Sequence, residues 1–244
     1  MNAHGIHSPF VFELYNEVIQ NNTDYYGYKT IENRREELVL DERILTVTDL
    51  GAGSNAGLKK QRKVKDVARI SVKNQRYARL LFRLVNHFQP NTIVELGTSL
   101  GLTTAYLAIA DSKTKIHSIE GCPETIAIAK ETIEKLELPN VNLINKNFDE
   151  ALPELLKEHS KVDFFFFDGN HTKEATLNYF YQCLEKISGD SIFIFDDIYW
   201  SGGMTEAWRE IKANPKVTVT LDLFQFGIVF FRKEQVKQDF ILKF

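Results

Sequence analysis

Two features of the sequence have the residue types and spacing of a nucleotide-binding site. The apolar run of residues 92–96 ends at Gly97, and Gly101 follows four residues later. Glycines at these positions allow a sharp turn and leave backbone N–H groups accessible at the start of the following helix. Glu120 ends the next predicted strand, 115–119, where a carboxylate can accept hydrogen bonds from both hydroxyls of a ribose. The pairing predicts that the chain binds an adenosine-containing cofactor.

The spacing of the glycines disfavours a nicotinamide or flavin cofactor. Dinucleotide-binding folds carry Gly-x-Gly-x-x-Gly after their first strand, whereas Gly97 and Gly101 are separated by three residues and preceded by Glu95. This Glu-x-Gly-x-x-x-Gly arrangement resembles the first motif of class I S-adenosylmethionine-dependent methyltransferases. Glu120 resembles the acidic residue that holds the ribose in that family. The alternative is an ordinary turn between a strand and a helix, with a surface glutamate nearby.

The resemblance implies S-adenosylmethionine as the cofactor and a set of residues that bind it. They comprise the glycine segment, the residues around the ribose carboxylate, two residues near adenine after the third strand and one acid after the fourth. They are Glu95, Gly97, Thr98, Ser99, Gly101, Glu120, Gly121, Cys122, Asn147, Phe148 and Asp168.

Strand-like and helix-like patterns alternate from residue 91 onward, which predicts an α/β fold with a Rossmann-like, doubly wound seven-stranded sheet. Only residues 224–226 separate the last two strands, too few for a crossover helix, so these strands should form a C-terminal antiparallel hairpin. The resemblance implies the same order of elements. Strands are expected at 92–96, 115–119, 141–145, 162–167, 191–196, 217–223 and 227–232, with helices at 100–110, 123–137, 149–158, 172–187 and 203–213.

The N-terminal part of the chain lies outside this pattern. We expect residues 1–70 to form an N-terminal extension or cap that is mainly helical, and residues 71–244 to form the methyltransferase domain. Ser8 and Pro9 are typical of a helix start, and mixed apolar spacing follows them. The extension should pack over the sheet or cover the active site.

Three carboxylates follow the fourth and fifth predicted strands. In doubly wound sheets, ligands bind beyond the carboxyl ends of the strands, so Asp168, Asp196 and Asp197 should lie on the same rim as the cofactor. Clustered carboxylates repel one another unless a cation or hydrogen-bond donors neutralise them, and oxygen ligands suit Mg²⁺ or another hard divalent cation. The alternative is that the aspartates cap the following helices, and both roles can hold together.

A closer resemblance accompanies these carboxylates. Phe-Asp-Gly-Asn-His at 167–171 and Phe-Asp-Asp at 195–197 resemble the metal-binding region of catechol and caffeoyl-CoA O-methyltransferases. The resemblance implies metal ligation by Asp168, Asp196 and Asp197, the last replacing an asparagine of the family. His171 occupies the place of the family's lysine base, and an imidazole can accept a proton near neutral pH. The expected catalytic residues are therefore His171 and Asp168.

Two aromatic residues, Tyr199 and Trp200, follow the fifth strand. They could stack on an aromatic substrate or simply pack the cap. The expected reaction is metal-assisted O-methylation of a small hydroxylated molecule. The methyl acceptor cannot be identified from the sequence.

Composition restricts the other partners. The 244 residues carry a formal net charge of −3, which gives no global attraction to nucleic acid or to an anionic membrane. Two cysteines, the lack of a signal-like N-terminus and the lack of a long apolar run predict a cytoplasmic protein that does not bind membranes. The oligomeric state stays open, with a homodimer as one option.

The basic segment 59–83, with ten Lys or Arg residues against one acid, leaves an alternative open. It is typical of a solvated helix face, but RNA could also bind it, so an RNA methyltransferase is the second enzymatic interpretation. A non-catalytic protein that binds the cofactor and docks through residues 1–90 is the third.

Overall fold

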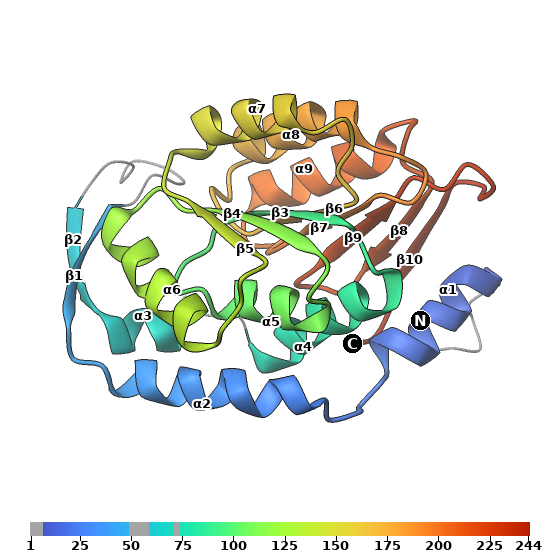
Figure 1. Ribbon diagram of the computed structural model, residues 1–244. Coiled ribbons are helices and arrows are strands. Elements are labelled where there is room, and N and C mark those ends of the chain that lie inside the picture. Colours follow the sequence, from blue (N-terminus) through green and yellow to red (C-terminus); the bar gives the residue numbers. More distant parts are fainter. Residues whose placement is uncertain (1–6, 49–58, 71–73) are drawn as a thin grey trace. The chain divides into compact units, whose positions relative to one another are not determined.

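The computed structural model describes residues 7–48, 59–70 and 74–244, which divide into two compact units (Figure 1). Unit 1 comprises residues 7–20 and 149–244, and unit 2 comprises the rest of the described chain. Eight strands, β3 to β10, belong to one mixed sheet, where seven were expected. None of the helices in the described ranges is both long and apolar enough to cross a membrane.

Unit 2 contains three parallel strands in the order β3-β4-β5, with α4 and α5 beneath them in Figure 1. Leu96 at the end of β3 is in register with Ile119 at the end of β4, so the segments after both strands begin at the same edge. The elements of unit 2 are α2 (Tyr26–Leu40), β1 (Ile44–Thr48), β2 (Lys59–Lys63), α3 (Val64–Ile70), α4 (Gln75–Phe88), β3 (Thr92–Leu96), α5 (Leu102–Ala110), β4 (Lys115–Ile119), α6 (Pro123–Lys135) and β5 (Val141–Ile144).

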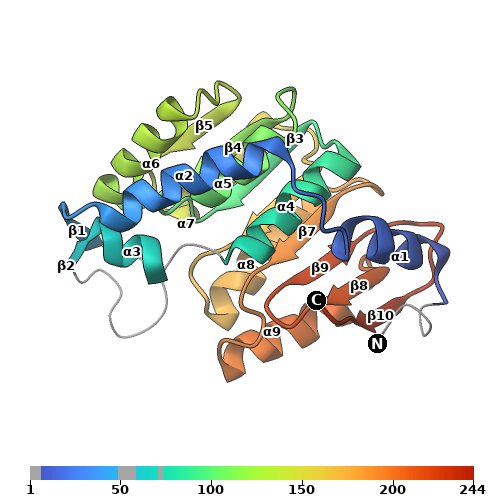
Figure 2. The same ribbon diagram turned by 90° about the horizontal axis from the view of Figure 1, so that it is seen from below.

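Helix α2 of the N-terminal extension forms a second layer on α4 and α5 (Figures 1 and 2). The buried ring of Tyr28 lies 5.0 Å from that of Phe82 on α4 and 5.7 Å from that of Tyr106 on α5, measured between centroids. Edge-on contacts between aromatic rings add to the stabilisation that burial provides. This part of the extension is therefore integral to unit 2.

The described part of the extension is mainly helical, as predicted, and it also contains a hairpin that the sequence did not reveal. Strands β1 and β2 pair antiparallel from Ile44 with Lys63 to Thr48 with Lys59. Strand β2 reads Lys-Lys-Gln-Arg-Lys, and without apolar residues it shows no periodicity that would reveal a strand. Its pairing with β1 forms the strand, and the connecting residues 49–58 lie outside the described part.

Unit 1 contains the strands β10-β8-β9-β7-β6 in that order. A π-helical turn, Tyr15–Ile19, continues the first helix, and a short 3-10 helix, Leu184–Lys186, continues α8. The other elements of unit 1 are α1 (Pro9–Leu14), α7 (Phe148–Glu158), β6 (Phe164–Phe167), α8 (Lys173–Cys183), β7 (Ile192–Phe195), α9 (Gly202–Ala213), β8 (Val219–Asp222), β9 (Gly227–Phe230) and β10 (Gln238–Ile241).

The predicted C-terminal hairpin is confirmed. Strands β8 and β9 pair antiparallel, and β9 also pairs antiparallel with β7, with Phe195 opposite Gly227. Strand β10 pairs parallel with β8 and is the strand that the sequence pattern did not reveal. It is a short edge strand whose one buried residue is Phe240, so its local pattern is too weak to identify it.

The four consecutive phenylalanines of β6 are buried, as expected for a central strand covered on both faces. The ring of Phe167 stacks on that of Phe195 of β7, with centroids 4.4 Å apart and planes 5° from parallel. Aromatic packing between β6 and β7 fixes the two strand ends after which Asp168 and Asp196 follow.

The first helix begins as the sequence predicts. Ser8 caps it by accepting a hydrogen bond from the backbone N–H of Val11, and Pro9 occupies the first position. Figures 1 and 2 show α1 beside the strands β8 to β10 of unit 1. Its Phe10 ring meets Phe230 of β9 at 5.1 Å between centroids, so α1 packs against the sheet.

Candidate functional site

The loop after β3 has the turn geometry expected of a cofactor loop. The backbone N–H groups of Gly97 and Thr98 both point at the carbonyl oxygen of Ile119, at N–O distances of 3.0 and 3.3 Å. Three residues of the loop have positive φ angles, 107° at Gly97, 50° at Ser99 and 79° at Gly101. Glycine reaches such angles without steric cost, and the loop therefore turns within a few residues between β3 and α5.

Gly101 is required by packing as well as by the turn. A Cβ atom at this position would lie 3.1 Å from the Cα atom and 3.2 Å from the carbonyl oxygen of Ala129 on α6. The sequence suggested that Gly101 opens the backbone to a ligand. The structure adds that it allows α6 to approach the loop closely.

Both oxygens of the Glu120 carboxylate bind backbone N–H groups. Oε2 accepts from Ser99 at 3.0 Å and Oε1 accepts from Cys122 at 2.9 Å. Burial raises the pKa of Glu120, while the N–H groups of Cys122, Ser99 and Gly121 oppose that rise. Because an ionised carboxylate accepts about four hydrogen bonds, lone pairs remain for a sugar after these contacts. Glu120 thus joins the glycine loop to the start of α6.

Glu95 lies inside the core and not at a ligand surface. Its side chain is fully buried, and its Oε2 accepts hydrogen bonds from the hydroxyls of Thr104 and Ser118. The Ser118 hydroxyl also lies 2.6 Å from that of Thr98 in the loop. Glu95 therefore supports the loop from below. The sequence argument missed Thr104 and Ser118. Thr104 stands in a mainly apolar helix, which is its signal, whereas Ser118 stands in a mixed strand that gives none.

The remaining predicted cofactor residues of unit 2 lie along the same edge. Cys122 is buried as the N-cap residue of α6, and its sulfur lies 3.5 Å from the backbone nitrogen of Thr48 in β1. Asn147 and Phe148 are partly exposed at the start of α7. Asn145, which the sequence argument missed, donates from Nδ2 to the Glu120 carbonyl at 2.8 Å. The sequence signal for Asn145 was an amide side chain directly after a strand.

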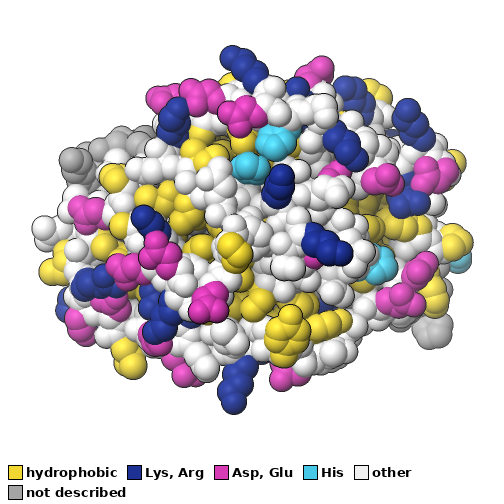
Figure 3. Space-filling view, in the orientation of Figure 1, with side chains coloured by type: hydrophobic (Ala, Val, Ile, Leu, Met, Phe, Trp, Pro, Cys, Tyr) yellow, Lys and Arg dark blue, Asp and Glu magenta, His cyan; other side chains and the backbone are white. Residues whose placement is uncertain are grey.

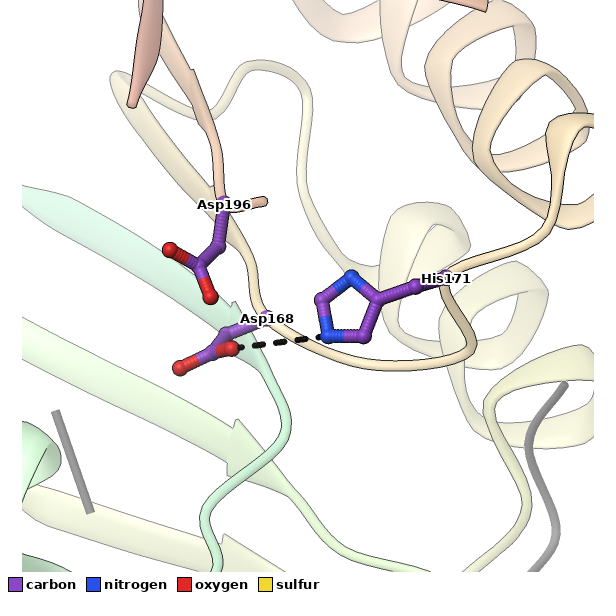
Figure 4. Close-up of side chains that lie close together, drawn as sticks. All are labelled: Asp168, His171 and Asp196. Carbon is purple, nitrogen blue, oxygen red and sulfur yellow. Dashed lines mark ion pairs between the residues drawn. The ribbon is translucent and has the colours of Figure 1, made fainter. Parts of the chain in front are cut away.

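A second set of residues comes together in unit 1. Asp168, His171 and Asp196 each offer one ligand atom, and these atoms lie within 4.8 Å of one another. Figure 4 shows the His171 imidazole facing the two carboxylates, with Asp168 and His171 after β6 and Asp196 after β7. His171 Nε2 lies 3.8 Å from Asp168 Oδ1, and Asp196 is 1% exposed.

This donor set fits a divalent cation. Ligand distances near 2.1 Å place two ligands of one ion at most about 4.2 Å apart, so the cluster needs to contract by only about half an ångström. Two carboxylates suit Mg²⁺ and Mn²⁺, and an imidazole nitrogen adds affinity for Mn²⁺ and later transition metals. Burying a carboxylate as deeply as that of Asp196 is costly unless it is paired with a cation or hydrogen-bonded.

The other predicted residues of unit 1 lie beside this cluster in sequence but are placed differently. Among the described residues, the cluster comprises Asp168, His171 and Asp196, and Asp197 is not part of it. It has a left-handed φ of 53°, and its carbonyl accepts a turn hydrogen bond from Trp200 at 2.9 Å. Trp200 is largely exposed. Tyr199 is partly exposed and donates its hydroxyl to Asp222, a contact that the sequence could not reveal.

The basic segment 59–83 is only in part a free positive surface. Lys63 and Lys65 both pair with Glu42, which lowers the pKa of that carboxyl to about 2. In Figure 3, the Lys and Arg side chains of the described residues are interspersed with Asp and Glu over the face in view. The pairing of Lys63 and Lys65 with Glu42 favours the solvated-surface interpretation of the segment over an RNA-binding one, which needs gathered positive charge.

Residues 94–198 match a protein family described as a methyltransferase domain. This stretch contains the whole glycine loop, Glu120 and the cluster of Asp168, His171 and Asp196. No curated protein matches the chain in sequence.

Solved structures resemble the chain over most of its length. The methyltransferase of Podospora anserina bound to S-adenosylhomocysteine has a TM-score of 0.64 at 14% identity, covering 93% of this chain and 97% of its own. A Staphylococcus aureus protein provisionally described as a caffeoyl-CoA O-methyltransferase has 0.63 at 16%, covering 91% and 97%. The O-methyltransferase of Bacillus cereus in complex with S-adenosylhomocysteine has 0.60 at 17%, covering 89% and 94%.

At these identities, the solved structures show the fold. The predicted α/β methyltransferase fold is confirmed, with an eighth strand added. The match of residues 94–198 to a methyltransferase-domain family agrees with the predicted resemblance to methyltransferases.

Proposed function

We propose that the protein is an S-adenosylmethionine-dependent O-methyltransferase that acts on a small hydroxylated molecule with the help of a divalent cation. The observation that carries the proposal is the Glu120 carboxylate, which is held by the N–H groups of Ser99 and Cys122 at the end of β4. The fold likeness to proteins described as O-methyltransferases supports the choice of oxygen as the methyl acceptor.

For the cofactor, Glu120 would accept hydrogen bonds from the ribose hydroxyls, and Gly121 and Cys122 would lie beside it. The loop residues Gly97, Thr98 and Ser99 would face the cofactor with their backbone, and Asn147 and Phe148 would lie near adenine. Glu95 and Gly101 would position the loop, since one is buried beneath it and the other packs on α6. These roles extend the predicted set by distinguishing residues that touch the ligand from those that support the loop.

For the acceptor, Asp168 and Asp196 would hold the cation, and Asp197 remains a candidate third ligand. A divalent cation bound there would lower the pKa of an acceptor hydroxyl. With Asp168 and Asp196 as the ligands, the His171 imidazole would stay unbound by the metal and would take the proton at Nε2, the nitrogen that faces Asp168. The acceptor oxygen would then be free to bond to the methyl carbon of bound S-adenosylmethionine, and S-adenosylhomocysteine would leave as that carbon's bond to sulfur breaks.

The cellular compartment, the domain bounds, the partners and the oligomeric state stay predictions. Both cysteines are free and buried, which suits a reducing cytoplasm. Residues 1–70 would form the extension to a domain of residues 71–244, although α2 packs on α4 and α5. Small molecules are the proposed partners, and a homodimer stays open.

Calorimetric titration with S-adenosylmethionine, with and without Mg²⁺ or Mn²⁺, tests the proposal. We expect micromolar cofactor binding, and a separate metal signal that is lost in Asp196→Ala. The control is Asp190→Ala, which removes an exposed aspartate near the start of β7 and should leave the metal signal intact. Cofactor binding without a metal signal would support the methyltransferase proposal and refute its metal-assisted part. No cofactor binding under any condition would refute the proposed function.

A further inference from the structure

Strand β1 of the N-terminal extension lies beside α6, the helix whose N-cap residue follows Glu120 by two positions (Figures 1 and 2). Residues 44–48 of this strand lie outside residues 94–198, the stretch that matches the methyltransferase family. One edge of β1 pairs with β2. The opposite edge carries backbone N–H and C=O groups that also need hydrogen-bond partners. Side chains of α6 supply these partners.

Two side chains at the start of α6 bind this edge of β1. The backbone N–H of Thr46 donates to the Glu124 carboxylate at 2.5 Å. The N–H of Thr48 donates to the sulfur of Cys122 at 3.5 Å, and the Cys122 thiol is directed at the carbonyl oxygen of Thr46 at 3.7 Å. Alternate residues of a strand direct their backbone groups to the same edge, so Thr46 and Thr48 both face α6. The first turn of α6 thus takes the place of a neighbouring strand.

An ion pair fastens the other end of β1 further along α6. Arg43 directly precedes the strand, and its guanidinium donates to both carboxylate oxygens of Glu131 at 2.8 Å. Bidentate pairs of this kind fix geometry as well as charge. Asp41 binds the same guanidinium, and these hydrogen bonds from Arg43 lower the pKa of Glu131. Strand β1 is therefore attached to α6 at both of its ends.

Cys122 connects β1 to the carboxylate of Glu120. Its N–H donates to Oε1 of Glu120 at 2.9 Å, while its buried sulfur contacts β1. Because Pro123 follows, the backbone of Cys122 is restricted to the extended region, and its N–H moves with the first turn of α6. The other Glu120 oxygen accepts from Ser99 in the glycine loop. The position of α6 that β1 secures therefore sets how the carboxylate is oriented.

We propose that strand β1 positions the ribose of the cofactor by holding the first turn of α6 and, through Cys122, the Glu120 carboxylate. The inference rests on the proposed function and adds Arg43, Thr46 and Glu124 as positioning residues. Their effect falls on the adenosine half of the cofactor, because Glu120 is the group that would bind the ribose. By thermodynamic linkage, bound cofactor would in turn stabilise the contact between β1 and α6.

The test compares two ligands on the full-length protein by calorimetry. S-adenosylhomocysteine contains both halves of the cofactor, whereas 5′-methylthioadenosine contains the adenosine half without the amino acid. We expect Glu124→Ala and Arg43→Ala each to weaken the binding of both ligands about fivefold, in line with the loss of one hydrogen bond. Glu124→Gln keeps an acceptor oxygen for the N–H of Thr46, so it should recover most of the affinity that Glu124→Ala loses.

The matched control is Glu42→Ala, because Glu42 pairs with Lys63 of β2 and Lys65 of α3, which belong to the extension and not to α6. It should leave both affinities within about twofold of the wild-type values. Hydrogen exchange on the wild-type protein gives a second readout that does not depend on any variant folding. S-adenosylhomocysteine should slow exchange of the backbone amides of Thr46 and Thr48. A merely structural role of β1 would leave their exchange unchanged on binding.

Affinities that change less than about twofold in both alanine variants would overturn the inference. So would S-adenosylhomocysteine binding that leaves the exchange of Thr46 and Thr48 unaltered. A loss confined to S-adenosylhomocysteine, with 5′-methylthioadenosine bound as tightly as before, would also overturn it, because the effect would then fall on the amino-acid half. Wild-type protein that binds neither ligand would refute the proposed function itself, and the inference with it.

Discussion

Replacing Gly101 with alanine tests whether the cofactor loop depends on this glycine. The native φ of 79° costs an L-residue about 1 to 2 kcal/mol. The added Cβ would also lie 3.1 Å from the Cα atom of Ala129, and backbone atoms cannot yield as a flexible side chain would. Overpacking of this kind costs about 1 to 3 kcal/mol. We therefore expect Gly101→Ala to destabilise the protein by about 2 to 5 kcal/mol.

Thermal unfolding and urea denaturation measure this loss. For a chain of this size, each kcal/mol shifts the melting temperature by about 2 to 4 °C, so the expected decrease is roughly 4 to 20 °C. Gly202→Ala is the matched control, because Gly202 begins α9 and a Cβ there would meet nothing within 4 Å. If Gly101→Ala melts within 2 °C of the wild-type protein, the packing argument is wrong. A small loss of stability together with normal cofactor affinity would also show that the loop does not need this glycine.

Three further predictions concern the cofactor carboxylate, the metal cluster and the buried network behind it. Glu120→Gln should weaken S-adenosylhomocysteine binding tenfold or more, because a neutral amide makes weaker hydrogen bonds than a carboxylate. Wild-type affinity should fall as the pH decreases through the raised pKa of Glu120, above the ordinary value for glutamate, and calorimetry at several pH values should show no such fall in the variant. Mn²⁺ at about 100 times its dissociation constant should stabilise the protein by about 2.7 kcal/mol in thermal shift assays, and a similar shift in Asp196→Ala would contradict the metal site. Tyr179→Phe should cost about 1 to 2 kcal/mol in urea denaturation, because the buried Tyr179 hydroxyl both donates and accepts a hydrogen bond, whereas Tyr181→Phe at the surface should cost less than 0.5 kcal/mol.

Local sequence patterns were sufficient for the parallel part of the fold. The strands that precede Gly97, Asp168 and Asp196 are short, mainly apolar runs, whereas β4, which precedes Glu120, is a mixed segment. The structure places strands at all four predicted positions. In a parallel sheet the carboxyl ends of such strands lie at one edge, so the chemistry-bearing residues could be assigned to strand ends from the sequence.

Local sequence patterns did not predict the strands that form only by pairing with distant residues. Strand β2 has no apolar residue and β10 has little apolar character, so neither shows a pattern of its own. Each is a strand because another strand, β1 or β8, supplies its hydrogen bonds. Periodicity reports which face of a segment is buried, and it carries no signal where the segment buries almost nothing.

The residues of the candidate site show the same difference between local pattern and tertiary structure. The sequence by itself determined the residue types: glycines for the turn, a glutamate after β4, and carboxylates and a histidine after β6 and β7. Only the tertiary structure decided that Glu95 supports the loop from the core and that His171 joins Asp168 and Asp196. It also decided that Asp222 holds Tyr199. Side-chain contacts between residues far apart in the chain are set by strand register and packing, which no local pattern encodes.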